Sequence, residues 1–200
     1  CLVRLIDPTD GDITINGKNI STLPPGPLRP YRSEFQIVFQ DPYRSLNPRR
    51  TIEQSLIEGP MNFGMSKVDA ISKAGEILEI VGISPDAMGR FPHQFSGGQR
   101  QRICIARAVV MEPKLIVADE AVSALDVSVQ KQVLDLFLDI RKRFGMAMLF
   151  ITHDLRVAAQ VCDRVVVMQK QWYAMGGTNL IDSSFSANLW FPVTCFLDVC

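Results

Sequence analysis

Reactive side chains stand directly after three short apolar stretches of this 200-residue sequence. They are two adjacent carboxylates, an amide and an imidazole: Asp119, Glu120, Gln40 and His153. Successive residues of a strand point in opposite directions, so one carboxylate can hold a cation while its neighbour faces a water or a substrate. These four side chains are therefore candidates for a catalytic site that holds a cation close to a reacting water.

A simpler structural role is open for the same residues. Asp119 and Glu120 could cap the helix that follows them, because acidic residues are frequent helix caps. Thr152, His153 and Asp154 also fit the start of a helix. The residues by themselves leave both interpretations open.

A serine and two glycines precede a helical pattern at Ser96, Gly97, Gly98 and Gln99. A hydroxyl and unhindered backbone amides at the positive end of a helix form a natural phosphate cradle. The alternative is an ordinary serine N-cap followed by flexible glycines. The two acids that come one helix and one strand later favour phosphate chemistry.

Hydrophobic patterning predicts the elements that position these side chains. The expected strands are Phe35–Phe39, Leu115–Ala118, Met146–Ile151 and Arg164–Met168, with a hairpin at Asp12–Ile20. The expected helices are the end of one at Cys1–Ile6, then Thr51–Glu58, Ser66–Gly82, Gln99–Met111, Val127–Arg143 and Asp154–Val161. Helices that alternate with fully apolar strands predict an α/β fold with a mainly parallel sheet covered on both faces. Ligands of such sheets bind at the carboxyl ends of the strands, where the reactive residues stand.

Composition excludes several classes of protein. Apolar residues make up 47% of the chain and the net charge is zero, so bulk charge does not favour nucleic acid or anionic lipid as a partner. No apolar run reaches the roughly 18 residues of a membrane-spanning helix. The five cysteines form no Cys-x-x-Cys pair and the two histidines lie far apart, which argues against disulfide frameworks and zinc sites.

Several motifs, in this order along the chain, resemble those of the nucleotide-binding subunits of ABC transporters. The similar segments are the Q-loop residue Gln40, the signature loop Ser96–Gln99, the Walker B strand with its catalytic glutamate at Leu115–Glu120, the D-loop Ser123–Asp126 and the switch histidine His153. Three further segments resemble the ATPases of oligopeptide and dipeptide importers: Phe39–Arg49, Pro92–Phe95 and Val122–Gln130.

The resemblance implies an ABC-type ATPase that uses ATP and Mg²⁺ at an interface between two subunits. Asp119 and Gln40 would bind the metal, Glu120 would polarise the attacking water and His153 would touch the γ-phosphate. The remaining site residues would close on ATP held by the second subunit or communicate across the dimer: Ser96, Gly97, Gly98, Gln99 and Asp126.

The resemblance also implies a P-loop NTPase-type fold with a helical, signature-bearing subdomain at about 45–112, within a partial ABC domain at 1–170. The chain has no Gly-x-x-x-x-Gly-Lys-Ser/Thr loop, since Gly11 and Gly17-Lys18 are separated by five residues and no hydroxyl follows. We therefore expect a chain that lacks the N-terminal strands and the P-loop of the family and binds ATP poorly alone. Ala121 replaces the usual proline, and residues 171–200 form an atypical tail.

The function implied is the powering of transport of peptides or similar small solutes across a membrane. The expected partners are a second ABC ATPase subunit and transmembrane permease subunits, with no nucleic acid and no membrane span in this chain, which would sit in the cytoplasm on the inner face of the cell membrane. Two alternatives stay open, a soluble ABC-type ATPase acting on nucleic acid or ribosomes and a non-catalytic interaction fragment.

Overall fold

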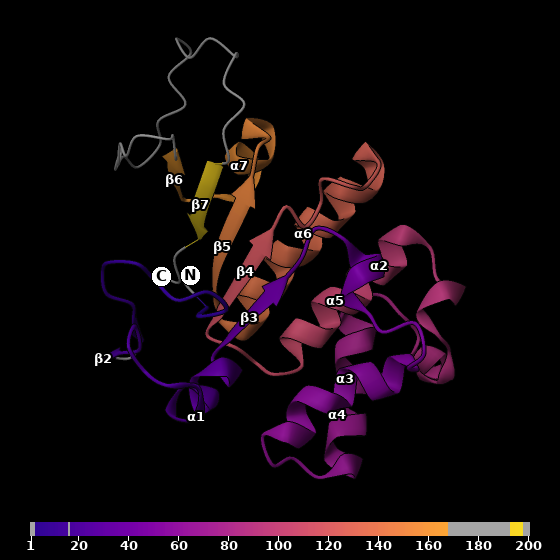
Figure 1. Ribbon diagram of the computed structural model, residues 1–200. Helices are drawn as coiled ribbons and strands as arrows, with labels where there is room; N and C mark the ends of the chain where they lie inside the picture. The colour runs from indigo at the N-terminus through magenta and orange to yellow at the C-terminus, as the bar shows by residue number, and fades with distance from the viewer. Residues whose placement is uncertain (1–2, 16, 168–192, 198–200) are drawn as a thin grey trace.

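A five-stranded sheet of order β3-β4-β5-β7-β6 organises the chain (Figure 1). The computed structural model describes residues 3–15, 17–167 and 193–197. The strands are β3 (Phe35–Val38), β4 (Leu115–Asp119), β5 (Ala147–Thr152), β6 (Arg164–Val167) and β7 (Val193–Leu197). Strands β3, β4 and β5 pair in parallel, so their carboxyl ends meet at one edge of the sheet. The predicted α/β fold with a mainly parallel sheet is confirmed.

Strand β7 comes from the segment predicted as an atypical tail. It runs antiparallel to both of its neighbours and lies between β5 and β6. In the register of the sheet, Cys195 stands opposite Phe150 of β5 and Val165 of β6. The other residues of the predicted tail, 171–192 and 198–200, lie outside the described residues.

Apolar side chains cover the sheet on both faces. On one face the strands join a large core together with the helices, through Val38, Ile116, Ala118, Met148 and Phe150. On the other face they join a smaller cluster with the N-terminal segment, through Phe35, Val117 and Leu149 packed with Val3, Ile20 and Leu28. Burial on both faces explains why the strands read as continuous apolar runs.

The helices lie mainly between β3 and β4 and after β4 along the chain. The α-helices are α1 (Pro25–Leu28), α2 (Pro42–Ser45), α3 (Ile52–Asn62), α4 (Lys67–Ile80), α5 (Gly97–Val109), α6 (Val127–Phe144) and α7 (Leu155–Val161). Short 3₁₀ helices are η1 (Arg29–Ser33), η2 (Pro85–Gly89) and η3 (Pro92–Gln94), and the hairpin is β1 (Thr14–Ile15) with β2 (Lys18–Asn19). Helices α2 to α5 gather beside the β3 edge of the sheet (Figure 1). The boundary of a separate helical subdomain at 45–112 stays a prediction.

Sequence signals at the helix ends agree with the structure. The hydroxyl of Thr51 begins α3 in a capping box with Gln54, and the hydroxyl of Ser66 begins α4. Helix α6 ends at Gly145, whose φ of 60° is left-handed and therefore favours glycine. Its last turn carries basic side chains that suit the negative end of the helix dipole.

The N-terminal segment differs from its prediction. Val3–Ile6 forms a turn and bends instead of the end of a helix, and Cys1 and Leu2 lie outside the described residues. The buried Arg4 explains the difference, because its guanidinium donates to the carbonyl oxygens of Ile20 and Leu23 and pairs with Asp7. These contacts hold Arg4 at a φ of 54°, which a right-handed helix does not allow.

Candidate functional site

Three of the strand-end side chains meet in one hydrogen-bonded group. The Glu120 carboxylate accepts a hydrogen bond from Gln40 Nε2 at 2.9 Å through its Oε2 atom. Its other oxygen, Oε1, lies 3.2 Å from His153 Nδ1. A single carboxylate is thus held between an amide from the β3 end and an imidazole from the β5 end, which is the convergence that parallel strands predict.

The backbone at Glu120 is left-handed, with a φ of 47°. Hydrogen bonds on both sides hold it there, from the Glu120 amide to the Ile151 carbonyl at 2.9 Å and from the Ser123 amide to the Glu120 carbonyl at 3.0 Å. A non-glycine residue in this region carries strain of about 1–3 kcal/mol and is typical of functional sites. The turn aims the Glu120 side chain at Gln40 and His153 and does not use it as a helix cap.

Ser123 belongs to this group as well, although the sequence places it only in the following loop. Its hydroxyl accepts from Gln40 Nε2 at 3.2 Å and donates to the Glu120 carbonyl at 3.0 Å. It therefore fixes both the amide and the turn that presents the carboxylate. The signal in the sequence is its spacing of three residues from Glu120, which suits a tight turn.

Asp119 stands at the end of β4 beside this group. Partial burial and, to a smaller extent, the neighbouring charge of Glu120 raise the pKa of the Asp119 carboxyl. A nearby cation would relieve both effects, and carboxylate and amide oxygens are the protein ligands that Mg²⁺ accepts together with water and phosphate. The donor set of Asp119 and Gln40 therefore fits Mg²⁺, although no cluster of three acidic, histidine or cysteine ligands occurs in the part of the chain that is described.

The raised pKa of Asp119 predicts a pH-dependent gain in stability on replacing it with asparagine. Above the raised pKa the folded protein carries an ionised side chain at a cost, whereas below the ordinary value of 3.8 the carboxyl is protonated in both folded and unfolded chains. Asp119→Asn should therefore raise the midpoint of thermal unfolding by about 1–3 °C near neutral pH. The gain should shrink as the pH falls toward 3.8, measured by calorimetry over that range. A gain of equal size at every pH would contradict this origin.

The residue after His153 begins the next helix. Asp154 caps α7 by accepting a hydrogen bond from the Arg156 amide at 2.8 Å. A side-chain hydrogen bond from the Arg156 guanidinium holds the pKa of Asp154 below its usual value. The helix-start interpretation thus applies to Asp154, while the His153 ring faces Glu120.

The signature-like residues form a second group at the start of α5. The Ser96 hydroxyl accepts from the Gln99 amide at 3.3 Å, and the Gln99 side chain accepts from the Ser96 amide at 3.0 Å. This capping box is the structural alternative predicted from the sequence. Within the described chain no hydrogen bond uses the amides of Gly97 and Gly98 and none joins Ser96–Gln99 to Glu120, so these amides could still hold a ligand.

Asp126 lies at the start of α6 and is exposed, and its side chain accepts no hydrogen bond from the helix amides. The short segment from Ser123 to Asp126 therefore begins at the Glu120 group and ends at α6.

A contact that the sequence does not predict lies on the other side of the site. The Arg100 guanidinium of α5 stacks 3.9 Å from the ring centroid of Tyr43 in α2. Helix α2 begins two residues after Gln40, so α5 also supports the Gln40 segment.

Residues 1–123 match the family described as ABC transporter. The chain belongs to the ABC transporter family. Among curated relatives of this ABC chain, the glutathione import ATP-binding protein GsiA of Escherichia coli (strain K12) is 51% identical over 168 residues. GsiA of Shigella dysenteriae serotype 1 (strain Sd197) is also 51% identical over the same length. These alignments cover 84% of this ABC chain and 27% of each relative, so the chain spans about a quarter of their length.

Solved structures agree with this membership. CbiO1 from Clostridium perfringens, part of the ABC transporter complex cbiONQ, superimposes with a TM-score of 0.73 at 26% identity, over 83% of this chain and 64% of that one. The ATP-binding cassette MJ0796, a dimer bound to ADP and Pi, superimposes with a TM-score of 0.67 at 28% identity, over 82% and 70%. The predicted family and its fold are therefore confirmed for this ABC chain.

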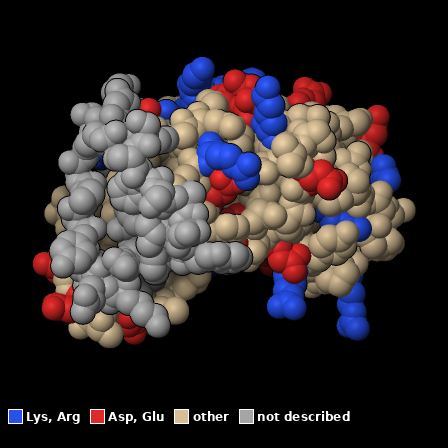
Figure 2. Space-filling model, turned by 90° about the horizontal axis from the view of Figure 1, so that it is seen from above, with Lys and Arg blue, Asp and Glu red and all other residues tan. Residues whose placement is uncertain are grey.

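The surface of this ABC chain carries both signs of charge. Viewed from above, basic and acidic side chains are interspersed over the described part of the face in Figure 2. This matches the 21 basic and 21 acidic residues of the sequence. Among the described helices, none combines the length and the apolar character that a membrane crossing requires.

Proposed function

We propose that this chain is the ATP-hydrolysing part of a membrane importer for peptides or a related small solute. The observation that carries the proposal is the Glu120 carboxylate held between Gln40 and His153 at the carboxyl edge of the parallel strands. The name of the relatives, glutathione import ATP-binding protein, supports a small peptide as the solute.

In this proposal Glu120 orients the attacking water and accepts its proton as the water oxygen bonds to the γ-phosphorus. The bond from that phosphorus to the bridging oxygen breaks and ADP leaves. Gln40 and Ser123 hold the Glu120 side chain and its turn, so that little reorganisation is needed during the reaction. His153, on the far side of the carboxylate, is placed to donate to the γ-phosphate.

Asp119 and Gln40 would hold Mg²⁺, which when bound neutralises charge on the phosphate oxygens. Asp119 is adapted to this task because burial and the Glu120 charge already disfavour its ionised form without a cation. Glu120 is assigned to the water and not to the metal, and its contacts with Gln40 and His153 hold it in place for that role.

A second ATPase subunit completes the site in this proposal. Ser96 to Gln99 and Asp126 are exposed or half-exposed, as a surface that closes on another subunit requires. The dimeric structure of the similar cassette MJ0796 supports such a pairing. The whole assembly would lie in the cytoplasm on the inner face of the cell membrane, bound to permease subunits.

The test of the proposal is hydrolysis of ATP by the full-length protein. Phosphate release that depends on Mg²⁺ and rises with the square of protein concentration at low concentration would support an ATPase that works as a dimer. Absence of phosphate release from the full-length protein together with its permease subunits would overturn the proposal and favour a non-catalytic interaction role.

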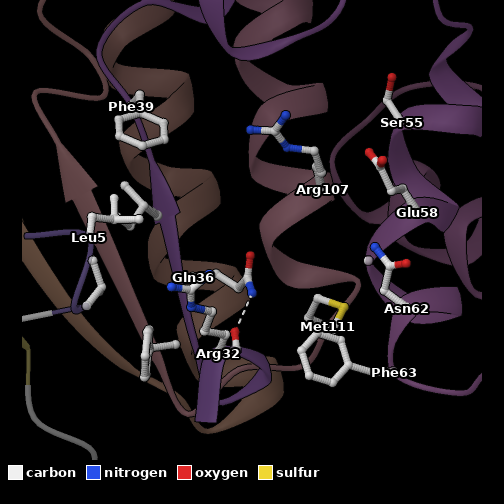
Figure 3. A pocket seen from close by; sticks show the side chains of 14 residues that line it. Leu5, Arg32, Gln36, Phe39, Ser55, Glu58, Asn62, Phe63, Arg107 and Met111 are labelled. Atoms are coloured by element: carbon white, nitrogen blue, oxygen red, sulfur yellow. Dashed lines mark hydrogen bonds between the residues drawn. The ribbon is translucent and has the colours of Figure 1, made fainter. Parts of the chain in front are cut away.

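The proposed permease contact is a groove beside Tyr43. Its wider part is a space of about 880 Å³ bordered by the segment from Tyr43 to Arg50. It adjoins a pocket of about 400 Å³ between β3, α3 and α5, where Glu58 and Asn62 point toward the same space as Arg107 (Figure 3). A groove between the elements that carry Gln40 and the signature turn could transmit movement to both.

The chemistry of this groove favours a partner segment that carries carboxylates and apolar side chains. Arginines that line the groove are Arg44, Arg49, Arg50 and Arg107. One acidic side chain, Glu58, lines it and already pairs with Arg50 at 2.6 Å. The exposed ring of Tyr43 supplies apolar surface.

Reversing a charge in the groove is expected to weaken permease binding. Arg49→Glu should lower the affinity of the full-length protein for its permease subunits by about tenfold at low salt, and by less at high salt, because exposed charges are screened. The measurement is a binding titration in detergent. Lys18→Glu, an equal reversal at the exposed hairpin strand β2, is the control. Equal losses for both variants would contradict the proposed docking surface.

A further inference from the structure

The two glycines of the turn at the start of α5 have different surroundings. A Cβ atom at Gly98 would lie 2.7 Å from Cγ1 of Val129 in α6, whereas nothing lies within 4 Å of a Cβ at Gly97. Separate carbon atoms pack at about 3.5–4.0 Å, so no methyl group fits at residue 98. Packing within this chain therefore requires glycine at position 98, whereas no such contact requires glycine at position 97.

Val129 is poorly able to move aside. It lies in the first turn of α6 and packs against the large hydrophobic core. A β-branched side chain in a helix has one strongly preferred χ1 rotamer, so rotating it away from Gly98 is unfavourable. A side chain at 98 would therefore push the starts of the two helices apart.

A second contact fixes the same pair of helices one turn further on. Arg102 of α5 donates to the side chain of Gln132 in α6 at 3.2 Å. The other terminal nitrogen of Arg102 donates to the carbonyl of Val81, at the end of α4, at 2.9 Å. Two adjacent turns of α5 are thus held against α6, and the first of them carries the signature-like residues.

We infer that Val129 is a positioning residue for the turn Ser96–Gln99. Its side chain fills the space left by glycine at 98 and so sets the spacing between this turn and the start of α6, where Asp126 lies. The consequence for activity rests on the proposed function, which assigns both segments to one nucleotide at a subunit interface. A misplacement of about 1 Å in such a site can cost about 10²-fold in rate.

Thermal unfolding of the chain tests the spacing without any nucleotide. Gly98→Ala should lower the midpoint by about 3–10 °C because it overpacks the contact with Val129. Gly97→Ala, the matched control, should leave the midpoint unchanged or raise it. Adding Val129→Ala to Gly98→Ala should restore most of the loss, whereas adding Val127→Ala, the same change at a side chain that is 83% exposed, should not.

Amide exchange measured by NMR tests whether Val129 acts on the turn itself. Val129→Ala should speed exchange at the amides of residues 99–101 by about tenfold more than at the amides of β4, since it opens the contact at one place. Val129→Ile keeps the Cγ1 atom, so exchange at the same amides should stay as slow as in the wild type. A residue that only stabilises the whole fold would change the two sets of amides alike.

Three results would overturn the inference. They are a Gly97→Ala loss as large as that of Gly98→Ala, a double variant with Val129→Ala as unstable as Gly98→Ala alone, and equal exchange changes at residues 99–101 and in β4. ATP turnover of the same variants in the full-length protein is a separate measurement. If neither the wild type nor any variant turns over ATP, that result counts against the proposed function. It does not affect the inference about the spacing between Gly98 and Val129.

Discussion

Replacing Glu120 with glutamine is expected to lower ATP turnover by about 10²–10⁴-fold while the affinity for ATP stays unchanged. Glutamine keeps the shape of the side chain but cannot accept the proton of the attacking water. It can still lie between Gln40 and His153, so the local structure should survive. Turnover is measured as phosphate release, and affinity by equilibrium binding of a fluorescent ATP analogue.

Both measurements need a phosphate-binding loop, and the sequence from Cys1 to Cys200 has no Gly-x-x-x-x-Gly-Lys-Ser/Thr motif. The assay therefore uses the chain joined before Cys1 to a strand, loop and helix with that motif. Glu76→Gln, the same change at an exposed position of α4, serves as the control. Turnover that survives in Glu120→Gln, or ATP affinity that falls in parallel with it, would remove Glu120 from the proton-accepting role.

The Ser96→Arg variant is expected to lose about 10²-fold in ATP turnover, the size of effect found when one well-placed donor is removed from a site of developing charge. The arginine side chain would occupy the surface on which, in the proposed function, a second subunit closes, and the Ser96 hydroxyl would be lost from the turn. Binding of ATP to the separate subunit should stay intact, because in the proposed function Ser96 contacts the nucleotide held by the partner and not the one held by its own subunit. Gel filtration with ATP should show a monomer.

Ser66→Arg is the matched control for this variant. Ser66 caps α4 through the Asp69 amide at 3.2 Å, much as Ser96 caps α5 through the Gln99 amide at 3.3 Å. Loss of a cap costs about 1 kcal/mol in either helix. If both variants lose equal turnover, the effect comes from helix stability and the signature assignment is wrong.

Much of the fold was predictable because its elements carry local signals. Strands β4 and β5 are continuous apolar runs, and the helices α4, α5 and α6 begin at residues with capping side chains or end at glycine. The proximity of Gln40, Glu120 and His153 also follows from the sequence, since residues after parallel strands share one edge of the sheet. Their roles in ATP hydrolysis stay predictions.

Other features depend on contacts between distant residues and leave no local signal. The left-handed backbone at Glu120 results from hydrogen bonds to Ile151 and Ser123. The crowding of Gly98 by Val129 arises only when α5 and α6 pack together. The bend at Val3–Ile6 arises because Arg4 reaches the carbonyls of Ile20 and Leu23. In each case a tertiary contact decides what local propensity leaves open.

The place of β7 in the sheet has a consequence for how the chain reaches its native state. Strand β6 pairs with β7, and β7 pairs with β5 across separations that run from 41 positions, between Thr152 and Val193, to 49 positions, between Met148 and Leu197. Contacts so remote in sequence form slowly, because a long loop must close before they stabilise anything. Until β7 docks, the backbone edge of β5 is open to strands from other molecules, so aggregation during refolding should depend on residues 193–197.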